Sequence, residues 1–275
     1  MIYLNGNPVV FGNFPNKEFN MDIQLLNILP SNGITWNYED DGDFIKLFTL
    51  KRYLDELGYR SRLYIGYMPY SRMDRMNKFY AFSLKYACEM INGMGFYKVV
   101  VKEAHSDVTP ALLSNCTVDH WCERMLLSGR QNNLHEMYPI LQEFDSLFFP
   151  DAGAQKRYSE IKGWKCAVGY KVRNFEDGAI ESFDIKGTVG ENVLIVDDLC
   201  SRGGTFIHSA IELRKAGAKK VSLMVAHCEE NVFTGELFDY IDMIYTSKGM
   251  LTKMMKESTD SNPYWARVSK QIKEI

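Results

Sequence analysis

The chain has 275 residues, 46% of them hydrophobic, which is enough apolar material for one large domain or two smaller ones. Its formal net charge is −3 at pH 7, so it lacks the basic surplus that nucleic-acid-binding proteins carry. The longest apolar runs are about five residues, too short to cross a membrane. We therefore expect neither nucleic acid nor membrane as a partner.

Helix and strand patterns alternate along the first half of the chain. Residues 44–57 repeat apolar side chains at helical spacing and stop at Gly58, which predicts a helix with a glycine cap. A strand is predicted over residues 63–68, a second helix over 79–91 and a further strand over 97–101. This alternation predicts a mostly parallel sheet covered by helices.

The second half repeats this order of elements. Strands are predicted over residues 147–149, 166–170, 193–196 and 221–226, with a helix over 206–215. The stretch 173–187 is charged and poor in apolar residues, which predicts a mobile loop, with a hairpin as the alternative.

These patterns together predict an α/β protein of two domains. The first is expected to cover residues 1–137 and the second residues 138–275, with the junction within residues 132–142. Each domain is expected to contain a mostly parallel sheet flanked by helices. Six scattered cysteines without a Cys-x-x-Cys pair suit reduced thiols, and the first ten residues lack a signal-peptide pattern, so we expect a cytoplasmic protein.

Polar, charged or glycine residues follow the predicted strands. Ligands of open parallel sheets bind beyond the carboxyl ends of the strands. The residues in these positions are 70–75, Glu103 and His105, 151–153, and Asp197 onward. Their shared placement predicts a ligand site at each sheet edge.

The stretch VLIVDDLCSRGGTF (193–206) is the most informative of these segments. Gly203 and Gly204 permit a tight turn, and the amides at the start of the next helix can hold a phosphate. Asp197 and Asp198 can hold sugar hydroxyls or a hydrated Mg²⁺. A plain turn with capping acids is the alternative. We favour ligand binding because an apolar strand precedes the acids and a helix follows the glycines.

This stretch resembles the phosphoribosyl-diphosphate-binding loop shared by phosphoribosyltransferases and ribose-phosphate diphosphokinases. Two segments of the first half resemble the diphosphokinases alone. FPNKE (14–18) is similar to a segment that contacts the adenine of ATP, and YMPYSRMDR (67–75) to a motif whose arginine reaches ATP. The resemblance implies an ATP-binding set consisting of Phe14, Asn16, Glu18, Arg72, Asp74 and Arg75.

Three further segments match in the same family's order. VKEAH (101–105) resembles a metal-binding acid and histidine, FPDAGA (149–154) a sugar-phosphate segment, and YKVR (170–173) a catalytic loop. The implied catalytic residues are Lys171, Arg173 and His105, and the implied Mg²⁺ ligands are Glu103, His105 and Asp151. The implied sugar-phosphate set is Asp151, Gly153, Asp197, Asp198, Ser201, Arg202, Gly203, Gly204 and Thr205.

The resemblance implies two phosphoribosyltransferase-type domains and a defined reaction. The β,γ-diphosphate of ATP would pass to the anomeric hydroxyl of ribose 5-phosphate, giving phosphoribosyl diphosphate and AMP in nucleotide biosynthesis. The family also implies a homo-oligomer, either a dimer or a hexamer. Two rivals remain: an ordinary phosphoribosyltransferase, which consumes the diphosphate donor, and a non-catalytic regulatory relative.

The chain departs from the family pattern at several positions. Ser201-Arg202 stands where the family has Asp-Thr, Met73 replaces a glutamine and Glu103 replaces an aspartate. An added arginine in the phosphate loop suits a second phosphate, as in ADP-ribose, which also has a free anomeric hydroxyl. The alternative acceptor is therefore ADP-ribose, giving ADP-ribose 1-diphosphate for NAD salvage, and motif drift without a change of substrate is the other explanation.

Overall fold

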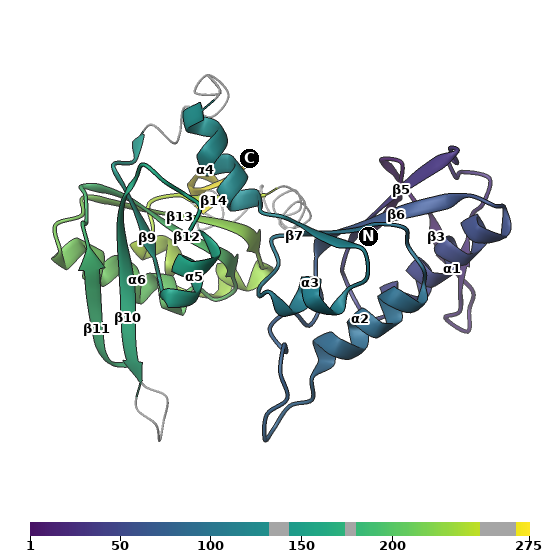
Figure 1. The fold of residues 1–275 in the computed structure, drawn as a ribbon, viewed down its shortest axis with the longest axis horizontal. Helices are drawn as coiled ribbons and strands as arrows, with labels where there is room; N and C mark the ends of the chain where they lie inside the picture. The colour runs from purple at the N-terminus through teal and green to yellow at the C-terminus, as the bar shows by residue number, and fades with distance from the viewer. Residues whose placement is uncertain (132–142, 174–179, 248–267) are drawn as a thin grey trace. The chain divides into compact units, whose positions relative to one another are not determined.

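The computed structural model describes residues 1–131, 143–173, 180–247 and 268–275. Within them the chain forms two compact units, Met1–His120 and Trp121–Ile275, each built around its own sheet (Figure 1). The segment 132–142, in which we predicted the junction, lies outside the described residues. No helix in the described ranges is long and apolar enough to cross a membrane.

The first unit contains a six-stranded sheet in the order β2-β1-β5-β6-β7-β8. Its strands are β1 (Ile2–Leu4), β2 (Asn7–Pro8), β5 (Ser31–Asn37), β6 (Arg60–Tyr67), β7 (Val99–Lys102) and β8 (Cys116–Asp119). Strands β5 to β8 are parallel, whereas β1 is antiparallel to both β2 and β5. A separate hairpin consists of β3 (Phe11–Asn13) and β4 (Phe19–Met21).

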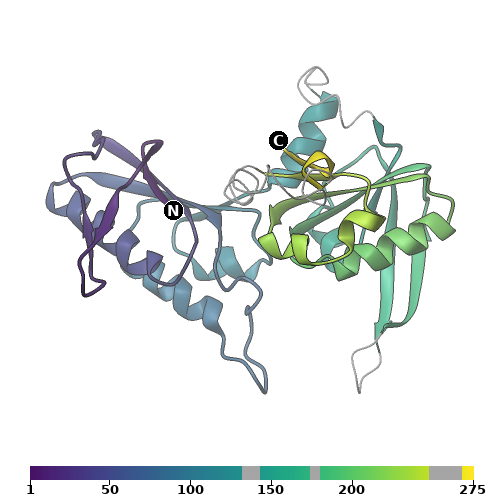
Figure 2. The same cartoon turned by 180° about the vertical axis from the view of Figure 1, so that it is seen from behind.

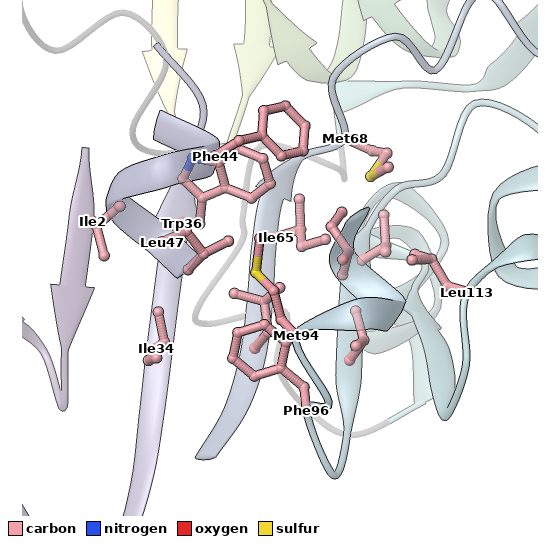
Figure 3. Close-up of a cluster of buried hydrophobic side chains, with 14 of the residues drawn as sticks. Ile2, Ile34, Trp36, Phe44, Leu47, Ile65, Met68, Met94, Phe96 and Leu113 are labelled. Atoms are coloured by element: carbon pink, nitrogen blue, oxygen red, sulfur yellow. The ribbon is translucent and has the colours of Figure 1, made fainter. Parts of the chain in front are cut away.

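The core of the first unit lies between this sheet and its helices. The helices are α1 (Asp43–Glu56), α2 (Ser83–Gly93) and α3 (Val108–Leu112). Alternate strand residues such as Ile34 and Trp36 of β5 and Ile65 of β6 are fully buried, and Phe44 and Leu47 of α1 belong to the same apolar cluster (Figure 3). This burial is the period-two pattern of a sheet face packed on helices.

The second predicted helix begins later than expected. We predicted it over residues 79–91, but α2 starts at Ser83. The side chain of Asn77 accepts hydrogen bonds from the amides of Phe79 (2.8 Å) and Tyr80 (2.9 Å). These bonds hold the preceding segment in a turn, because an asparagine side chain competes with helical hydrogen bonding for nearby amides.

The second unit contains a seven-stranded sheet in the order β11-β10-β9-β12-β13-β14-β15. Its strands are β9 (Ser146–Phe149), β10 (Lys165–Arg173), β11 (Ile180–Gly187), β12 (Asn192–Cys200), β13 (Lys220–Cys228), β14 (Ile244–Thr246) and β15 (Ile272–Glu274). All neighbours are parallel except β10 and β11, which form an antiparallel hairpin. The predicted fold class, two mostly parallel sheets flanked by helices, is confirmed.

The expectation of a loop over residues 173–187 is wrong where the structure describes this stretch. Residues 180–187 form β11, whose pairing with β10 runs from Ala167 opposite Gly187 to Arg173 opposite Ile180. The hairpin alternative applies here, because β10 supplies backbone partners and Phe183 packs against the apolar core. Residues 174–179 lie outside the described residues.

Both faces of the second sheet are covered (Figures 1 and 2). Its helical segments are α4 (Trp121–Gln131), α5 (Ala152–Arg157), α6 (Gly204–Lys215), η3 (Glu230–Thr234), α7 (Leu237–Tyr240) and η4 (Ser269–Gln271). On β12, Leu194 and Val196 join the apolar cluster that contains residues of α4 and α5, whereas Val193 and Ile195 join the cluster that contains residues of α6 and α7. An unbroken apolar run suits a parallel strand buried on both faces.

Candidate active site

The β3–β4 hairpin carries the segment 14–18 at its tip. The amide of Phe14 donates to the Glu18 carbonyl (2.8 Å), and the Asn16 side-chain amide donates to the Glu18 carboxylate (2.8 Å). Lys17 has a φ of 71°, an unusual left-handed conformation for a residue other than glycine. Phe14 is 53% exposed. The tip therefore presents an accessible aromatic ring beside an ordered pair of polar side chains.

The loop that follows β6 is held in a strained conformation at Tyr70, whose φ is 60°. The ring of Tyr70 stacks on Phe44, with centroids 6.4 Å apart, and its hydroxyl donates to the Asp41 carboxylate. Hydrogen bonds from Tyr70, which has the larger effect, and from Tyr38 lower the pKa of Asp41. Strained backbone of this kind persists only where its surroundings fix it. These contacts set the path of the chain into Arg72, which is exposed.

Asp74 links the loop after β6 to the loop after β7. The Arg75 guanidinium donates to the Asp74 carboxylate at 2.9 Å, and Asp74 is buried. Burial raises the pKa of Asp74, but Arg75 first, and then Ser106 and His105, outweigh this effect and hold the pKa below its ordinary value. Asp74 of the segment 67–75 therefore lies within electrostatic range of His105 of the segment 101–105.

Glu103 and His105 form the candidate metal position of the first unit. Glu103 is 2% exposed, has a φ of 46°, and its amide donates to the Asp119 carbonyl at 2.9 Å. Across the described residues, no three His, Cys, Asp or Glu side chains are grouped as a metal site. A buried carboxylate beside a histidine nevertheless fits Mg²⁺ carried by a nucleotide, because that ion takes one or two protein ligands and fills its other positions with phosphate oxygens and water.

Asp151 starts α5 in the second unit. Its side chain accepts a hydrogen bond from the Ala154 amide (2.9 Å), which makes it the N-cap of this helix. Gly153 lies in the same first turn. Both residues follow β9, at the carboxyl end of a central parallel strand.

Asp197 and Asp198 lie near the end of β12 and share one cation. The Arg157 Nη1 atom donates to Asp198 Oδ1 at 2.7 Å and to Asp197 Oδ1 at 3.2 Å. The three side chains are only 15% (Arg157), 16% (Asp197) and 6% (Asp198) exposed. Arg157 lies outside every motif that predicted this site.

Residues 201–203 form the turn between β12 and α6, and Gly204 and Thr205 begin the helix. Gly203 has a φ of 80°, and a β-carbon there would lie 2.8 Å from Leu237, so both conformation and space favour glycine. The amides of Phe206 and Ile207 donate to the Gly203 carbonyl at 2.9 Å. The first amides of a helix lack intrahelical acceptors, so those of Gly204 and Thr205 are suited to an anion. Ser201 is half-buried and Arg202 is exposed.

Lys171 and Arg173 lie in the last part of β10, in the hairpin with β11. Lys171 is opposite Phe183 and Arg173 is opposite Ile180, with a register shift between residues 172 and 173. Val168 is opposite Phe149, the last residue of β9, so β10 continues beyond the end of its parallel neighbour. The strand thus carries both basic residues past the sheet edge at which Asp151 follows β9.

No protein-family model matches the chain. The ribose-phosphate pyrophosphokinase of Pyrococcus furiosus is 30% identical over 205 residues, which is 69% of this chain and 67% of that protein. The one from Pyrococcus abyssi is 26% identical over 204 residues, 69% of this chain and 65% of that protein. The matches therefore span about two thirds of these curated relatives. The crystal structure of phosphoribosylpyrophosphate synthetase from Mycobacterium smegmatis, 18% identical, aligns with a TM-score of 0.69 over 98% of this chain and 85% of that chain.

Proposed function

Because this chain belongs to the ribose-phosphate pyrophosphokinase family, we propose that it transfers the β,γ-diphosphate of ATP to the anomeric hydroxyl of ribose 5-phosphate. The observation that carries this proposal is the turn between β12 and α6. Two acids precede it, a left-handed glycine forms it, and the amino end of a twelve-residue helix follows it. That order of groups suits a sugar hydroxyl pair next to a phosphate.

The second unit would bind the sugar phosphate. Asp197 accepts hydrogen bonds from ribose hydroxyls, and Asp198, the next residue of β12, helps to hold Asp197 in position. The phosphate rests on the amides at the start of α6, where the helix dipole favours negative charge, with Ser201 and Thr205 as hydroxyl donors. Asp151 and Gly153 complete this set at the end of β9.

The first unit would bind the nucleotide. Phe14 stacks on the adenine ring, while the paired side chains of Asn16 and Glu18 accept and donate hydrogen bonds at its edge. Arg72 and Arg75 attract the phosphates, and Asp74 keeps Arg75 in place through their ion pair.

The transfer step places negative charge on the β-phosphate as the sugar oxygen attacks it. Lys171 and Arg173 would stabilise that charge, since preorganised cations are the main means by which proteins accelerate such transfers. Mg²⁺ would supply further neutralisation of the phosphate oxygens. Glu103 and His105 are the proposed ligands in the first unit, and Asp151 is the proposed ligand in the second.

Ribose 5-phosphate is the proposed acceptor, because the curated relatives are named ribose-phosphate pyrophosphokinases. A ³¹P NMR time course with Mg·ATP tests this choice. We expect AMP and a new diphosphate signal with ribose 5-phosphate, and slower or no reaction with ADP-ribose. Reaction of phosphoribosyl diphosphate with a free base, without AMP formation from ATP, would instead identify a phosphoribosyltransferase. Nucleotide binding with no reaction of any kind would identify a regulatory relative.

The Phe14→Ala variant should raise the KM for ATP about tenfold, because stacking of a base on an aromatic ring contributes ~1–3 kcal/mol. The KM for ribose 5-phosphate should stay within about twofold, since the hairpin tip belongs to the proposed nucleotide site. Steady-state kinetics with each substrate varied in turn measures both values. Phe48→Ala is the matched control, because Phe48 is a phenylalanine of the same unit with similar exposure, 46% against 53%. Equal effects of the two variants would remove Phe14 from the ATP site.

A further inference from the structure

Arg157 is the last residue of α5, and one of its nitrogen atoms bridges the two acids of β12. Nη1 lies 2.7 Å from Asp198 Oδ1 and 3.2 Å from Asp197 Oδ1. The Asp197 Oδ1 atom also accepts the amide of Asp198 at 2.9 Å. Four polar groups therefore converge at the end of a single strand, and the arginine is the one cation among them.

The two contacts of Arg157 are unequal. Its Nη1 atom lies closer to Asp198 Oδ1 (2.7 Å) than to Asp197 Oδ1 (3.2 Å), and Asp198 is also the more buried of the two acids. Leu194 and Val196, which precede the acids on β12, pack in the apolar cluster that contains Ala154 of α5, the helix that ends at Arg157. Asp198 is therefore the acid that Arg157 holds more closely.

The charges at this position depend on one another. Burial and the adjacent Asp198 charge raise the pKa of Asp197, and the positive charge of Arg157 opposes that rise. Burial alone would lower the pKa of Arg157, but Asp198 first, and then Tyr158 and Asp197, more than offset this, and its pKa is raised. A charge buried without its partner is strongly destabilising, whereas a paired one is tolerated.

Resting on the function proposed above, we propose that Arg157 is a positioning residue for the sugar site. It binds Asp198 as an internal counter-ion and thereby fixes the end of β12, which leaves Asp197 as the acid that meets the ribose hydroxyls. Without Arg157, repulsion between two neighbouring carboxylates would turn Asp197 away from the position in which it accepts those hydroxyls. The two acids, which the sequence presents as equivalent, therefore have different tasks.

The Arg157→Met variant tests this role, because methionine keeps an unbranched apolar side chain and removes the charge. The KM for ribose 5-phosphate should rise about tenfold, since a misplaced carboxylate loses the benefit of preorganisation. The KM for ATP should remain within about twofold, because the nucleotide contacts are unaltered. Arg157→Lys should recover part of the loss, as it restores a positive charge without the planar guanidinium. Lys156→Met, an exposed neighbour on the same helix, is the control.

A second variant covers the case in which Arg157→Met fails to fold. The double variant Arg157→Met/Asp198→Leu removes both buried charges, a change that proteins tolerate better than the loss of one partner. We expect it to fold, as judged by its thermal unfolding midpoint, and to bind ribose 5-phosphate more tightly than the single variant in calorimetry. Such non-additivity is the mark of two residues that act through direct contact.

The outcomes separate this inference from the proposed function. If the wild-type enzyme forms no AMP from ATP and ribose 5-phosphate, the proposed function is wrong whatever the variants do. If the wild type is active and Arg157→Met changes the KM for ribose 5-phosphate by less than about twofold, the positioning role is overturned. An equal rise in the KM for both substrates would also overturn it, because that result indicates general loss of structure.

Discussion

Replacing Lys171 by alanine should lower kcat by about a thousandfold, because removing one preorganised donor to a developing negative charge costs on the order of 10²–10³ in rate. The KM values should change little, since the lysine is expected to act mainly on the transition state. The rate of AMP formation at saturating ATP and ribose 5-phosphate measures this effect. Arg173→Ala, a variant of the same strand, should also lower kcat and leave the KM values nearly unchanged.

Lys186→Ala is the control for this experiment. Lys186 lies on β11 of the same hairpin, is exposed, and places its Nζ atom 4.8 Å from the ring centroid of Tyr170. It therefore matches Lys171 in residue type and in the hairpin that carries it, and its loss should leave kcat within about twofold. Turnover retained by Lys171→Ala would assign the catalytic charge to a different residue and withdraw the role inferred from the resemblance.

The fold could be predicted wherever a strand or helix is specified by its own residues. The apolar run that forms β12 and the helical spacing that forms α1 are local patterns, and both elements are confirmed. The hairpin of β10 and β11 could not be predicted with the same assurance. Its charged second strand is stabilised by pairing with β10 and by the packing of Phe183, and neither contact is visible in a local pattern.

The sequence predicts which segments form the candidate site, but it does not predict how their side chains contact one another. The family motifs identify Asp197 and Asp198, yet they give no reason to connect these acids with Arg157, which is 40 residues away along the chain. At the end of a short helix, an arginine ordinarily indicates only a favourable charge for the helix dipole. Its function as a counter-ion depends on how α5 packs on the sheet, and this packing appears only in the folded structure.

Backbone strain is a second feature that the sequence did not reveal. Tyr70, in the loop after β6, and Glu103, the first residue after β7, adopt positive φ values, a conformation that residues other than glycine rarely take. Neither residue type suggests such a conformation. Both lie in segments that the resemblance assigned to ligand binding, which agrees with the tendency of strained backbone to gather at functional sites.

The Asp197→Asn variant should raise the KM for ribose 5-phosphate about a hundredfold, because a hydrogen bond to a charged acceptor contributes ~1.5–3 kcal/mol and the carboxylate is expected to accept from ribose hydroxyls. Asparagine keeps the size of the side chain, so the end of β12 should remain folded. Steady-state kinetics with ribose 5-phosphate varied at saturating ATP measures the change, and calorimetric titration with the sugar phosphate alone measures binding without the reaction.

Asp184→Asn is the control for this substitution, because Asp184 is exposed on β11 of the same unit. This variant should leave the KM values for both substrates unchanged.

The more informative comparison is with Asp198→Asn. If Arg157 holds Asp198 as a counter-ion, Asp198→Asn should weaken sugar binding indirectly and destabilise the second unit more than Asp197→Asn does, because it removes the shorter contact of the buried guanidinium, 2.7 Å against 3.2 Å. Asp197→Asn should weaken sugar binding strongly with little loss of stability. Equal effects of the two substitutions on both quantities would contradict the division of tasks between the acids and return them to a single equivalent pair.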